Sequence, residues 1–314
     1  MLVLTLAAAP AAAASPFAAE VTDATLQIQG GPEAERIALR LAASDATTLE
    51  VDLGDDGSAD ASFALATFAS IELDAGNGDD VVRIDQANGP FTTLKPTRMS
   101  GGNGDDTFFG GTGSETYFGG RGDDVVDGNA GADTGFLGHG DDTFIWDPGD
   151  GSDTVAGQAG WDTMVFNGSG GAEIFAATAD GERVRFTRNL GTIVMDLDDV
   201  EAIDLRALGG ADSLAVNDAT GTDLRLVAVD LAEVIGGATA DGAGDTVTVV
   251  GTAAVDTIAA TLVGSTITVD GLVAMTEVTH ADAALDRLVI DSGAGDDDVT
   301  LDPALAGRIL TTVQ

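Results

Sequence analysis

The stretch from Gly101 to Val165 reads GGNGDDTFF, GGTGSETYF, GGRGDDVVD, GNAGADTGF and LGHGDDTFI, then the dipeptide WD, then PGDGSDTVA and GQAGWDTMV. It is a nine-residue unit that occurs seven times, and only Trp146 and Asp147 interrupt its phase. An acid occupies the sixth position of every unit, and an apolar residue occupies the eighth position of all but one, where Gly135 stands. Such a period predicts a repeat architecture in which neighbouring units stack on one another.

Each unit divides into a turn and a short strand. The glycines of the first half suit a backbone with φ > 0 that approaches a ligand closely. In the second half, the alternation of a strand would turn the eighth residue inward and its neighbours outward. Two units would make one turn of a flattened helix, and stacked turns would form two parallel sheets. Turn carbonyls and sixth-position carboxylates of adjacent turns would then face one another, and such rows of hard oxygens suit Ca²⁺.

The unit resembles the RTX, or haemolysin-type, calcium-binding repeat, whose pattern is G-G-x-G-x-D-x-U-x with U apolar. The stretch Thr143–Ser169 also resembles a group of bacterial exported proteins described only as calcium-binding. The resemblance implies an all-β chain, a right-handed parallel β-roll or β-solenoid with calcium between turns, flanked here by degenerate β modules. It further implies that the ligands are the sixth-position carboxylates and the backbone carbonyls of the glycine turns.

Carried over residue by residue, the resemblance gives two rows of calcium ligands and one isolated turn. One edge would carry Asp106, Asp124, Asp142 and Asp162 with the turn glycines Gly102, Gly104, Gly120, Gly122, Gly138 and Gly140; the other would carry Glu115, Asp133 and Asp153; and Asp80 would belong to the isolated turn GNGDD. The inserted dipeptide weakens this expectation for the sites at Asp153 and Asp162.

We expect the two rows to bind calcium unequally. In the second row Glu115 has a longer side chain than aspartate, Asn129 replaces a glycine, and Pro148 precedes a displaced turn. The tighter sites should therefore lie in the first row, between successive aspartates from Asp106 to Asp142.

Weaker copies of the pattern flank the array. Similar segments recur in LDAGNGDDVVRID, LRALGGADSLAVN and IDSGAGDDDVTLD, each after β-rich sequence. We therefore expect β modules at residues 20–100, 166–244 and 245–314 around the array at 101–165. Residues 32–42 could be a short helix, but their alternating apolar residues favour a strand. The final residues, LTTVQ, are similar to the FTTL that shortly precedes the array, so we expect the last module to be truncated and the chain to be a fragment of a longer repeat protein.

The composition narrows the function classes. The chain has 53 acidic and 13 basic side chains, a formal net charge of -40, 44% hydrophobic residues and a mean hydropathy of +0.17. Nucleic acid is a poor partner for such a chain, because phosphate binding needs a basic patch. The apolar content argues for a folded chain that needs bound cations to offset its self-repulsion. No cysteine is present, and Lys95, His139 and His280 are the only lysine and histidines, so thiol chemistry and His-rich zinc sites are excluded.

The N-terminus indicates export. Residues 1–14 resemble the apolar region and small-residue cleavage site of a signal peptide cut after Ala14, although the basic start is missing and the true start would lie upstream. No transmembrane segment is expected. We expect a secreted bacterial protein, extracellular or at the cell surface, that is unfolded in the cytosol and folds on calcium after export. Type I-secreted members of the family carry an uncleaved C-terminal signal instead, so the export route stays open.

Other functional readings compete with calcium binding. A structural or adhesive stalk would share the chemistry and add a cell-surface or matrix partner. A carbohydrate-active β-helix enzyme would need cations in a cleft, for which Arg183 and Arg185 are the candidates; pairing with nearby acids on an exposed face is preferred, and no enzyme is expected. The turn Asp52–Asp60 resembles an EF-hand loop, but Gly54 and Phe63 occupy ligand positions, so a solvated acidic turn is preferred.

Overall fold

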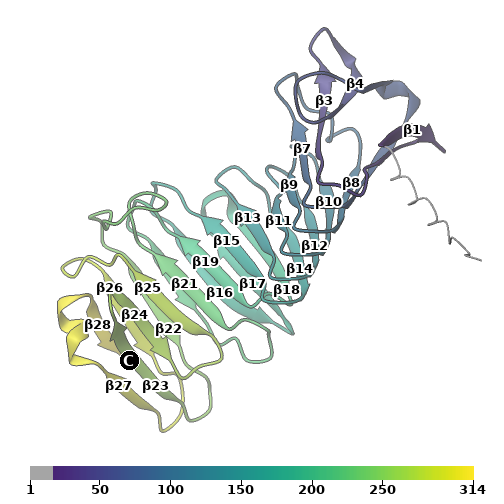
Figure 1. Cartoon of the computed structure of the whole chain (residues 1–314). Coiled ribbons are helices and arrows are strands. Elements are labelled where there is room, and N and C mark those ends of the chain that lie inside the picture. The colour runs from purple at the N-terminus through teal and green to yellow at the C-terminus, as the bar shows by residue number, and fades with distance from the viewer. Residues whose placement is uncertain (1–16) are drawn as a thin grey trace, which may run out of the picture.

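The computed structural model describes residues 17–314, so the signal peptide expected at residues 1–14 lies outside the described residues. The described chain is a β-solenoid built from two 14-stranded sheets, which we call sheet A and sheet B. Figure 1 shows the strands stacked along one long axis, from the purple N-terminal end to the yellow C-terminal end. The predicted all-β roll is confirmed.

Sheet A contains these strands in spatial order: β1 (Ala18–Thr22), β2 (Thr25–Gln29), β6 (Ser70–Asn77), β8 (Thr97–Asn103), β10 (Glu115–Arg121), β12 (Thr134–His139), β14 (Thr154–Ala159), β18 (Ile193–Asp198), β17 (Arg183–Arg188), β16 (Ile174–Asp180), β20 (Ser213–Val216), β22 (Thr246–Val250), β26 (Arg287–Asp291) and β28 (Leu310–Val313).

Sheet B contains the strands that alternate with these along the chain, again in spatial order: β27 (Asp298–Leu301), β23 (Thr257–Val263), β24 (Thr266–Asp270), β25 (Met275–Thr279), β21 (Leu226–Asp230), β19 (Ala202–Arg206), β15 (Thr163–Asn167), β13 (Thr143–Trp146), β11 (Val125–Asp127), β9 (Thr107–Phe109), β7 (Val81–Asp85), β3 (Arg36–Ala42), β4 (Asp45–Leu53) and β5 (Ala61–Ala64). The helical elements of the described residues are three short 3-10 helices: η1 (Leu65–Thr67), η2 (Leu190–Thr192) and η3 (Pro303–Gly307).

Within the array, each turn of the solenoid uses two nine-residue units. The chain alternates between the sheets, and successive strands of one sheet are parallel and in register, as in the pair Thr116–Thr134 of β10 and β12. Equivalent residues of adjacent turns are 18 positions apart in the regular part of the array. The sequence period thus becomes a spatial repeat that places like residues on top of one another.

The eighth position of each unit forms the core between the sheets. Phe108, Tyr117 and Phe144 are fully buried there, as the alternation predicted. At the one glycine, Gly135, Leu137 and Phe144 fill the space, since an added Cβ would lie 3.4 Å and 3.3 Å from their side chains. Each of the other six units buries one apolar side chain at this position, worth about 1.5–3 kcal/mol, so the array depends on stacking for its stability.

The inserted dipeptide changes a loop and leaves the stacking intact. Trp146 ends β13 and is buried, with its ring stacked on Phe166 at a centroid distance of 4.0 Å. Its Nε1 donates a hydrogen bond to the carbonyl of Gly151, 2.8 Å away. The spacing between equivalent residues rises to 20, but the strands remain in register, as in the pair Thr134–Thr154.

The segments that flank the array contribute strands to the same two sheets. Antiparallel strands join the solenoid at β3–β4–β5, at β16–β17–β18 and at β23–β24–β25. The strand expected within residues 32–42 is β3. In residues 17–314, no helix is long and apolar enough to span a membrane.

Candidate calcium sites

The solenoid has two edges along which turns stack. We call the edge where the chain passes from sheet A to sheet B the first edge, and the return from sheet B to sheet A the second edge. The first edge carries the predicted ligands Asp106, Asp124, Asp142 and Asp162, and the second edge carries Glu115, Asp133 and Asp153. The structure therefore separates the predicted residues into the two rows that the nine-residue period implies.

The first-edge carboxylates form a hydrogen-bonded ladder. The backbone N–H of Asp106 donates to Oδ1 of Asp124 at 2.8 Å, and the N–H of Asp124 donates to Oδ1 of Asp142 at 2.7 Å. The N–H of Asp142 continues the row to Oδ1 of Asp162 at 2.9 Å, so the inserted dipeptide does not interrupt it. Asp80 joins the same row, because its N–H donates to Oδ1 of Asp106 at 2.8 Å. Each carboxylate thus points toward the preceding turn.

Two glutamates that were not predicted continue this ladder at its ends. The N–H of Glu35 donates to Oδ1 of Asp80 at 2.6 Å, and Oε2 of Glu201 accepts from the N–H of Asp162 at 2.8 Å. Neither glutamate follows a Gly-x-Gly turn. Each does stand two residues before a buried apolar residue, Ile37 or Ile203, and that acid-x-apolar spacing is the signal by which they could have been found.

The second oxygen of these carboxylates has no partner. Oδ2 of Asp80, Asp106, Asp124 and Asp142 is buried without a hydrogen bond. Asp124 itself is 0% exposed. Because buried polar atoms in native proteins are almost always partnered, a row of such oxygens indicates a missing ligand. An oxygen-seeking cation fits this donor set.

The glycine turns supply backbone carbonyls to the same edge. Gly102, Gly120 and Gly138 have φ of 113°, 117° and 122°. A Cβ added at Gly120 would lie 2.3 Å from the carbonyl oxygen of Gly102, and one at Gly122 would lie 2.1 Å from that of Gly104. Gly138 and Gly140 repeat both contacts one turn later. The carbonyls of one turn therefore face the next turn, and only glycine allows this approach.

A second, exposed row of aspartates runs beside the buried one. The N–H of Asp123 donates to Oδ1 of Asp105, and the N–H of Asp141 donates to Oδ1 of Asp123, both at 2.8 Å. These fifth-position residues were not predicted as site residues, although the repeated Asp-Asp dipeptide marks them in the sequence. They add negative charge on the exposed side of the first edge, next to the buried carboxylates.

The second edge carries a similar ladder on a different backbone. The N–H of Glu115 donates to Oδ1 of Asp133 at 2.7 Å, and the N–H of Asp133 donates to Oδ1 of Asp153 at 2.8 Å. Oε1 of Glu115 and Oδ2 of Asp133 are buried without partners. Gly111 and Gly113 lack the positive φ of the first-edge glycines, while Asn129 has φ of 54°. The backbone conformation of these turns therefore differs from that of the first edge, although their carbonyls also approach the next turn: a Cβ added at Gly131 would lie 1.8 Å from the carbonyl oxygen of Gly113.

Burial raises the pKa of the ladder carboxyls. The pKa is about 7 for Asp106, about 8 for Asp124 and about 9 for Asp133. Loss of hydration is the largest cause, backbone N–H donors oppose it, and neighbouring carboxylates raise the pKa further. The same direction holds for Asp80, Glu115, Asp142, Asp153 and Asp162. At neutral pH a proton or a nearby cation is therefore favoured most strongly at Asp124 and Asp133, whose pKa values are the highest of the row members.

No protein cation neutralises these carboxyls within the array. Residues 101–165 contain thirteen acidic side chains and one arginine, Arg121. Across the described residues 17–314, no ion pair involves a side chain of that segment. Nor does any group of three or more Asp, Glu, His or Cys side chains in that range converge on one point. A cation between turns would therefore draw on backbone carbonyls as well as carboxylates.

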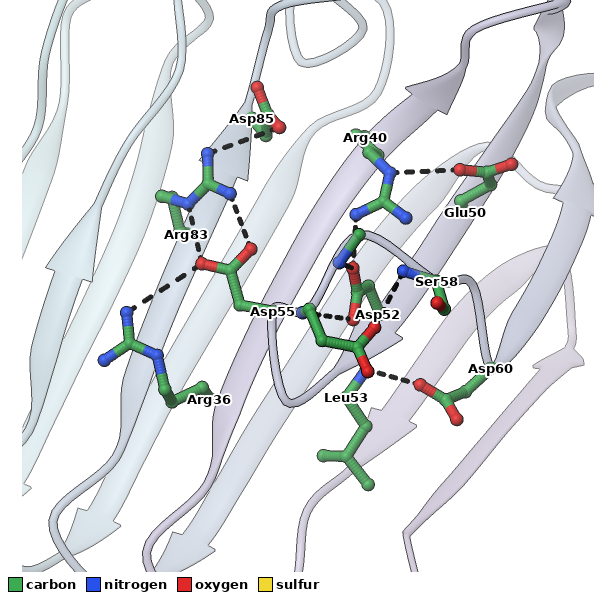
Figure 2. Close-up of polar contacts among 12 residues, drawn as sticks. Arg36, Arg40, Glu50, Asp52, Leu53, Asp55, Ser58, Asp60, Arg83 and Asp85 are labelled. Atoms are coloured by element: carbon green, nitrogen blue, oxygen red, sulfur yellow. Dashed lines mark hydrogen bonds and ion pairs between the residues drawn. The ribbon is translucent and has the colours of Figure 1, made fainter.

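The acidic turn at Asp52–Asp60 shows the opposite arrangement. Figure 2 shows Arg40 between Glu50 and Asp52, with its Nη1 2.5 Å from Oδ2 of the buried Asp52. Arg83 donates two hydrogen bonds to Asp55, at 2.6 and 3.1 Å (Figure 2). The expectation of a solvated acidic turn holds for residues 56–60, which are exposed, but not for Asp52 and Asp55, which pair with arginines from neighbouring strands.

Comparison with known proteins identifies the repeats. A family model described as the RTX calcium-binding nonapeptide repeat (4 copies) matches residues 98–114, 109–144 and 149–172. No curated protein matches the chain. The chain therefore carries RTX-type calcium-binding repeats, folded here as a β-roll whose edges bear the carboxylate ladders.

Proposed function

We propose that the array at residues 101–165 binds several Ca²⁺ ions between its turns and requires them to fold. The observation that carries this proposal is the row of buried, unpartnered Oδ2 atoms at Asp80, Asp106, Asp124 and Asp142. Calcium prefers six to eight oxygen ligands, and carboxylates together with backbone carbonyls are its usual donors.

The ions would be held by groups of two adjacent turns. On the first edge these are the free carboxylate oxygens of the sixth-position aspartates and the carbonyls of the positive-φ glycines, such as Gly102 and Gly104. When bound, the ions supply positive charge to a region where the protein places almost none. The ladder hydrogen bonds to Oδ1 hold each carboxylate in place, so the side chains need little reordering on binding.

We propose that first-edge sites bind more tightly than second-edge sites. First-edge turns share one backbone conformation with glycines at positive φ, whereas Gly111 and Gly113 of the second edge do not. One oxygen of Glu115 is already bonded by the N–H of Gly111 in its own turn, at 2.8 Å. The strongest pair of sites should flank Asp124.

The free energy of several sites is sufficient to control folding. With free calcium at ten times the dissociation constant, each site adds about 1.4 kcal/mol. Four sites would then add about 6 kcal/mol, comparable to the whole stability of many domains, about 5–15 kcal/mol. Extracellular modules bind calcium at about 10⁻⁴–10⁻³ M. Such a protein would stay unfolded in a low-calcium cytosol and fold outside the cell.

A second role, that of a stalk at the cell surface, is favoured by the elongated stack of strands in Figure 1. In that role calcium would stiffen the solenoid, and a cell-surface or matrix partner would bind elsewhere on it. A carbohydrate-active site at Arg183 has less support. Arg183 pairs with Asp196 at 2.6 Å and with Asp198 at 2.7 Å, as expected, so its charge is already engaged; Arg185 is exposed and makes no ion pair within residues 17–314.

Calcium titration calorimetry together with circular dichroism tests the proposal. The chain should bind several ions and gain β structure when millimolar calcium replaces chelator. Asp124→Asn should bind fewer ions, whereas Asp180→Asn, an equal charge change at an exposed strand end outside the array, should bind as many as the wild type. Equal β content with and without calcium would refute calcium-dependent folding, and an unchanged ion count in Asp124→Asn would refute the assigned sites.

A further inference from the structure

A third carboxylate ladder lies beyond the residues that the repeat family matches. It consists of Glu173, Asp212, Asp245 and Asp286, which immediately precede β16, β20, β22 and β26 at the second edge. The N–H of Glu173 donates to Oδ1 of Asp212 at 2.7 Å, that of Asp212 to Oδ1 of Asp245 at 2.8 Å, and that of Asp245 to Oδ1 of Asp286 at 2.9 Å. The contacts are of the same kind as those in the array.

The two ends of this ladder are satisfied by the protein. Glu173 pairs with the buried guanidinium of Arg188, and its Oε2 accepts from the N–H of Ser169 at 2.6 Å. At the other end, Oδ2 of Asp286 accepts from the N–H of Asp282 at 2.6 Å. Both oxygens of each end carboxylate therefore have partners, and at Glu173 an arginine supplies the positive charge.

The middle of the ladder is not satisfied. Oδ2 of Asp212 and Oδ2 of Asp245 are buried without a hydrogen bond. The two side chains are 5% and 2% exposed, and adjacent strands of sheet A hold them one turn apart. They repeat the arrangement of Asp106 and Asp124, in which one oxygen is fixed by the neighbouring backbone and the other lacks a partner.

One backbone carbonyl, that of Gly171, approaches the turn before Asp212, and one further carboxylate, that of Asp241, bonds to the same turn. Gly210 has φ of 122°, and a Cβ added there would lie 2.6 Å from the carbonyl oxygen of Gly171 in the preceding turn. Oδ2 of Asp241 accepts from the N–H of Gly210 at 2.9 Å, which joins the turn before Asp245 to the turn before Asp212. The charge of Asp241 also contributes to the raised pKa of both aspartates, after burial as the main cause.

We propose that Asp212 and Asp245 hold one further divalent cation, Ca²⁺, between the turns that lead into β20 and β22. The site lies outside the nonapeptide array and uses two unpartnered, buried carboxylate oxygens, as at Asp106 and Asp124. Arg188 fulfils the neutralising role one turn earlier, so the ladder requires an added ion only at its middle pair.

The test counts bound calcium on the full chain by equilibrium dialysis with radioactive calcium at saturation. The double variant Asp212→Asn/Asp245→Asn should bind one ion fewer than the wild type, because asparagine keeps the Oδ1 acceptor and loses the free anionic oxygen. The matched control Asp286→Asn should bind as many ions as the wild type, since both oxygens of Asp286 already have partners. An unchanged count in a folded double variant overturns the proposal.

Two further variants keep the result decisive. If the double variant does not fold, the count is made on Asp245→Asn, where loss of one ion supports the site and an unchanged count overturns it. Asp124→Asn reports on the array independently. If Asp124→Asn binds fewer ions but the Asp212 and Asp245 variants bind as many as the wild type, only the third-ladder site is refuted. If the ion count is unchanged in all of these variants, the array sites are refuted as well.

Discussion

The β3–β4 hairpin and the nonapeptide array bury carboxylates equally well but differ in the positive charge that lies beside them. Asp52 in β4 and Asp124 in the array are both 0% exposed. Arg40 lies 2.5 Å from Asp52, whereas Asp124 has no protein cation and one oxygen without any partner. The hairpin supplies the positive charge from its own sequence, and the array does not.

Under the proposed function, this difference makes the stability of one part of the fold depend on calcium and leaves the other part independent of it. A buried carboxylate paired with arginine is neutral overall in every environment. A buried carboxylate without a protein cation is stable only where a calcium ion or a proton neutralises it. If the array requires calcium as proposed, its stacking depends on the calcium concentration, whereas that of the arginine-paired hairpin does not.

The largest expected effect is that of pH on the calcium-free array. The ladder pKa values, about 7 at Asp106 and about 8 at Asp124, lie above the unfolded value of about 3.9. The folded state thus holds protons that the unfolded state releases, so this stability is fully present below pH of about 4 and is lost as the pH rises through 6–8. A pKa raised by only one unit at each of four carboxyls would lower the free energy of unfolding by about 5 kcal/mol once the pH has risen above it.

Circular dichroism of the chelated chain between pH 5 and pH 8 measures this effect. We expect β structure at pH 5 and its loss toward pH 8, and we expect saturating calcium to remove the loss. Constant or increasing stability over that range without calcium would show that the ladder carboxyls are not buried as described.

The next prediction concerns the stability of the hairpin in which Arg40 pairs with Asp52. Arg40→Met should cost about 3–5 kcal/mol, because it leaves Asp52 buried without its partner. The cost should be the same with calcium and with chelator, as judged by denaturant unfolding. Arg185→Met, at an exposed position of β17, removes the same charge and should change stability by less than about 0.5 kcal/mol. A loss of stability in Arg40→Met that depends on calcium would contradict the claim that this pair is independent of calcium.

A smaller effect, with a change of sign, is expected in the array. In saturating calcium Asp124→Asn should lose about 3 kcal/mol, the contribution of two sites at about 1.4 kcal/mol each. In chelator the same variant should be more stable than the wild type, because it keeps the Oδ1 acceptor and removes one buried charge. Paired unfolding curves in the two buffers measure both values. A loss of equal size in both buffers would show that Asp124 acts only through its hydrogen bond.

The smallest effect concerns the second edge. Glu115→Gln should change calcium-dependent stability by no more than about 1 kcal/mol, since one of its oxygens is bonded within its own turn and its turn lacks the positive-φ glycines. The same paired curves apply. A loss as large as that of Asp124→Asn would make the two edges equal and would contradict their proposed ranking.

The sequence was most informative where spacing is regular. The sixth and eighth positions of the array predicted both the ladder and the core, because an 18-residue turn places equivalent residues directly over one another. Beyond the array the same ladder contacts join residues 39, 33 and 41 positions apart, since hairpins and long loops intervene. The acid-x-apolar pattern is present at Glu173 and Asp212, but the spacing between successive acids is irregular. These ladder residues were therefore not predicted from the sequence.

The arginine pairs of the acidic turn escaped sequence analysis for a different physical reason. The charges of Asp52 and Asp55 are balanced by Arg40 of β3 and Arg83 of β7, which are distant from the turn in sequence. Only the pairing of β3 with β4 and with β7 brings those arginines to the turn. Local sequence therefore identifies which carboxylates are buried more readily than it identifies what neutralises them.

Hydrogen exchange read by mass spectrometry, with calcium and with chelator at neutral pH, tests most directly whether calcium neutralises the array. We predict that the amides of Asp106, Asp124 and Asp142, which donate along the ladder, exchange slowly only with calcium. Amides of β3 and β4, held by the arginine pairs, should remain protected in both buffers. Equal protection of the array amides without calcium would contradict the claim.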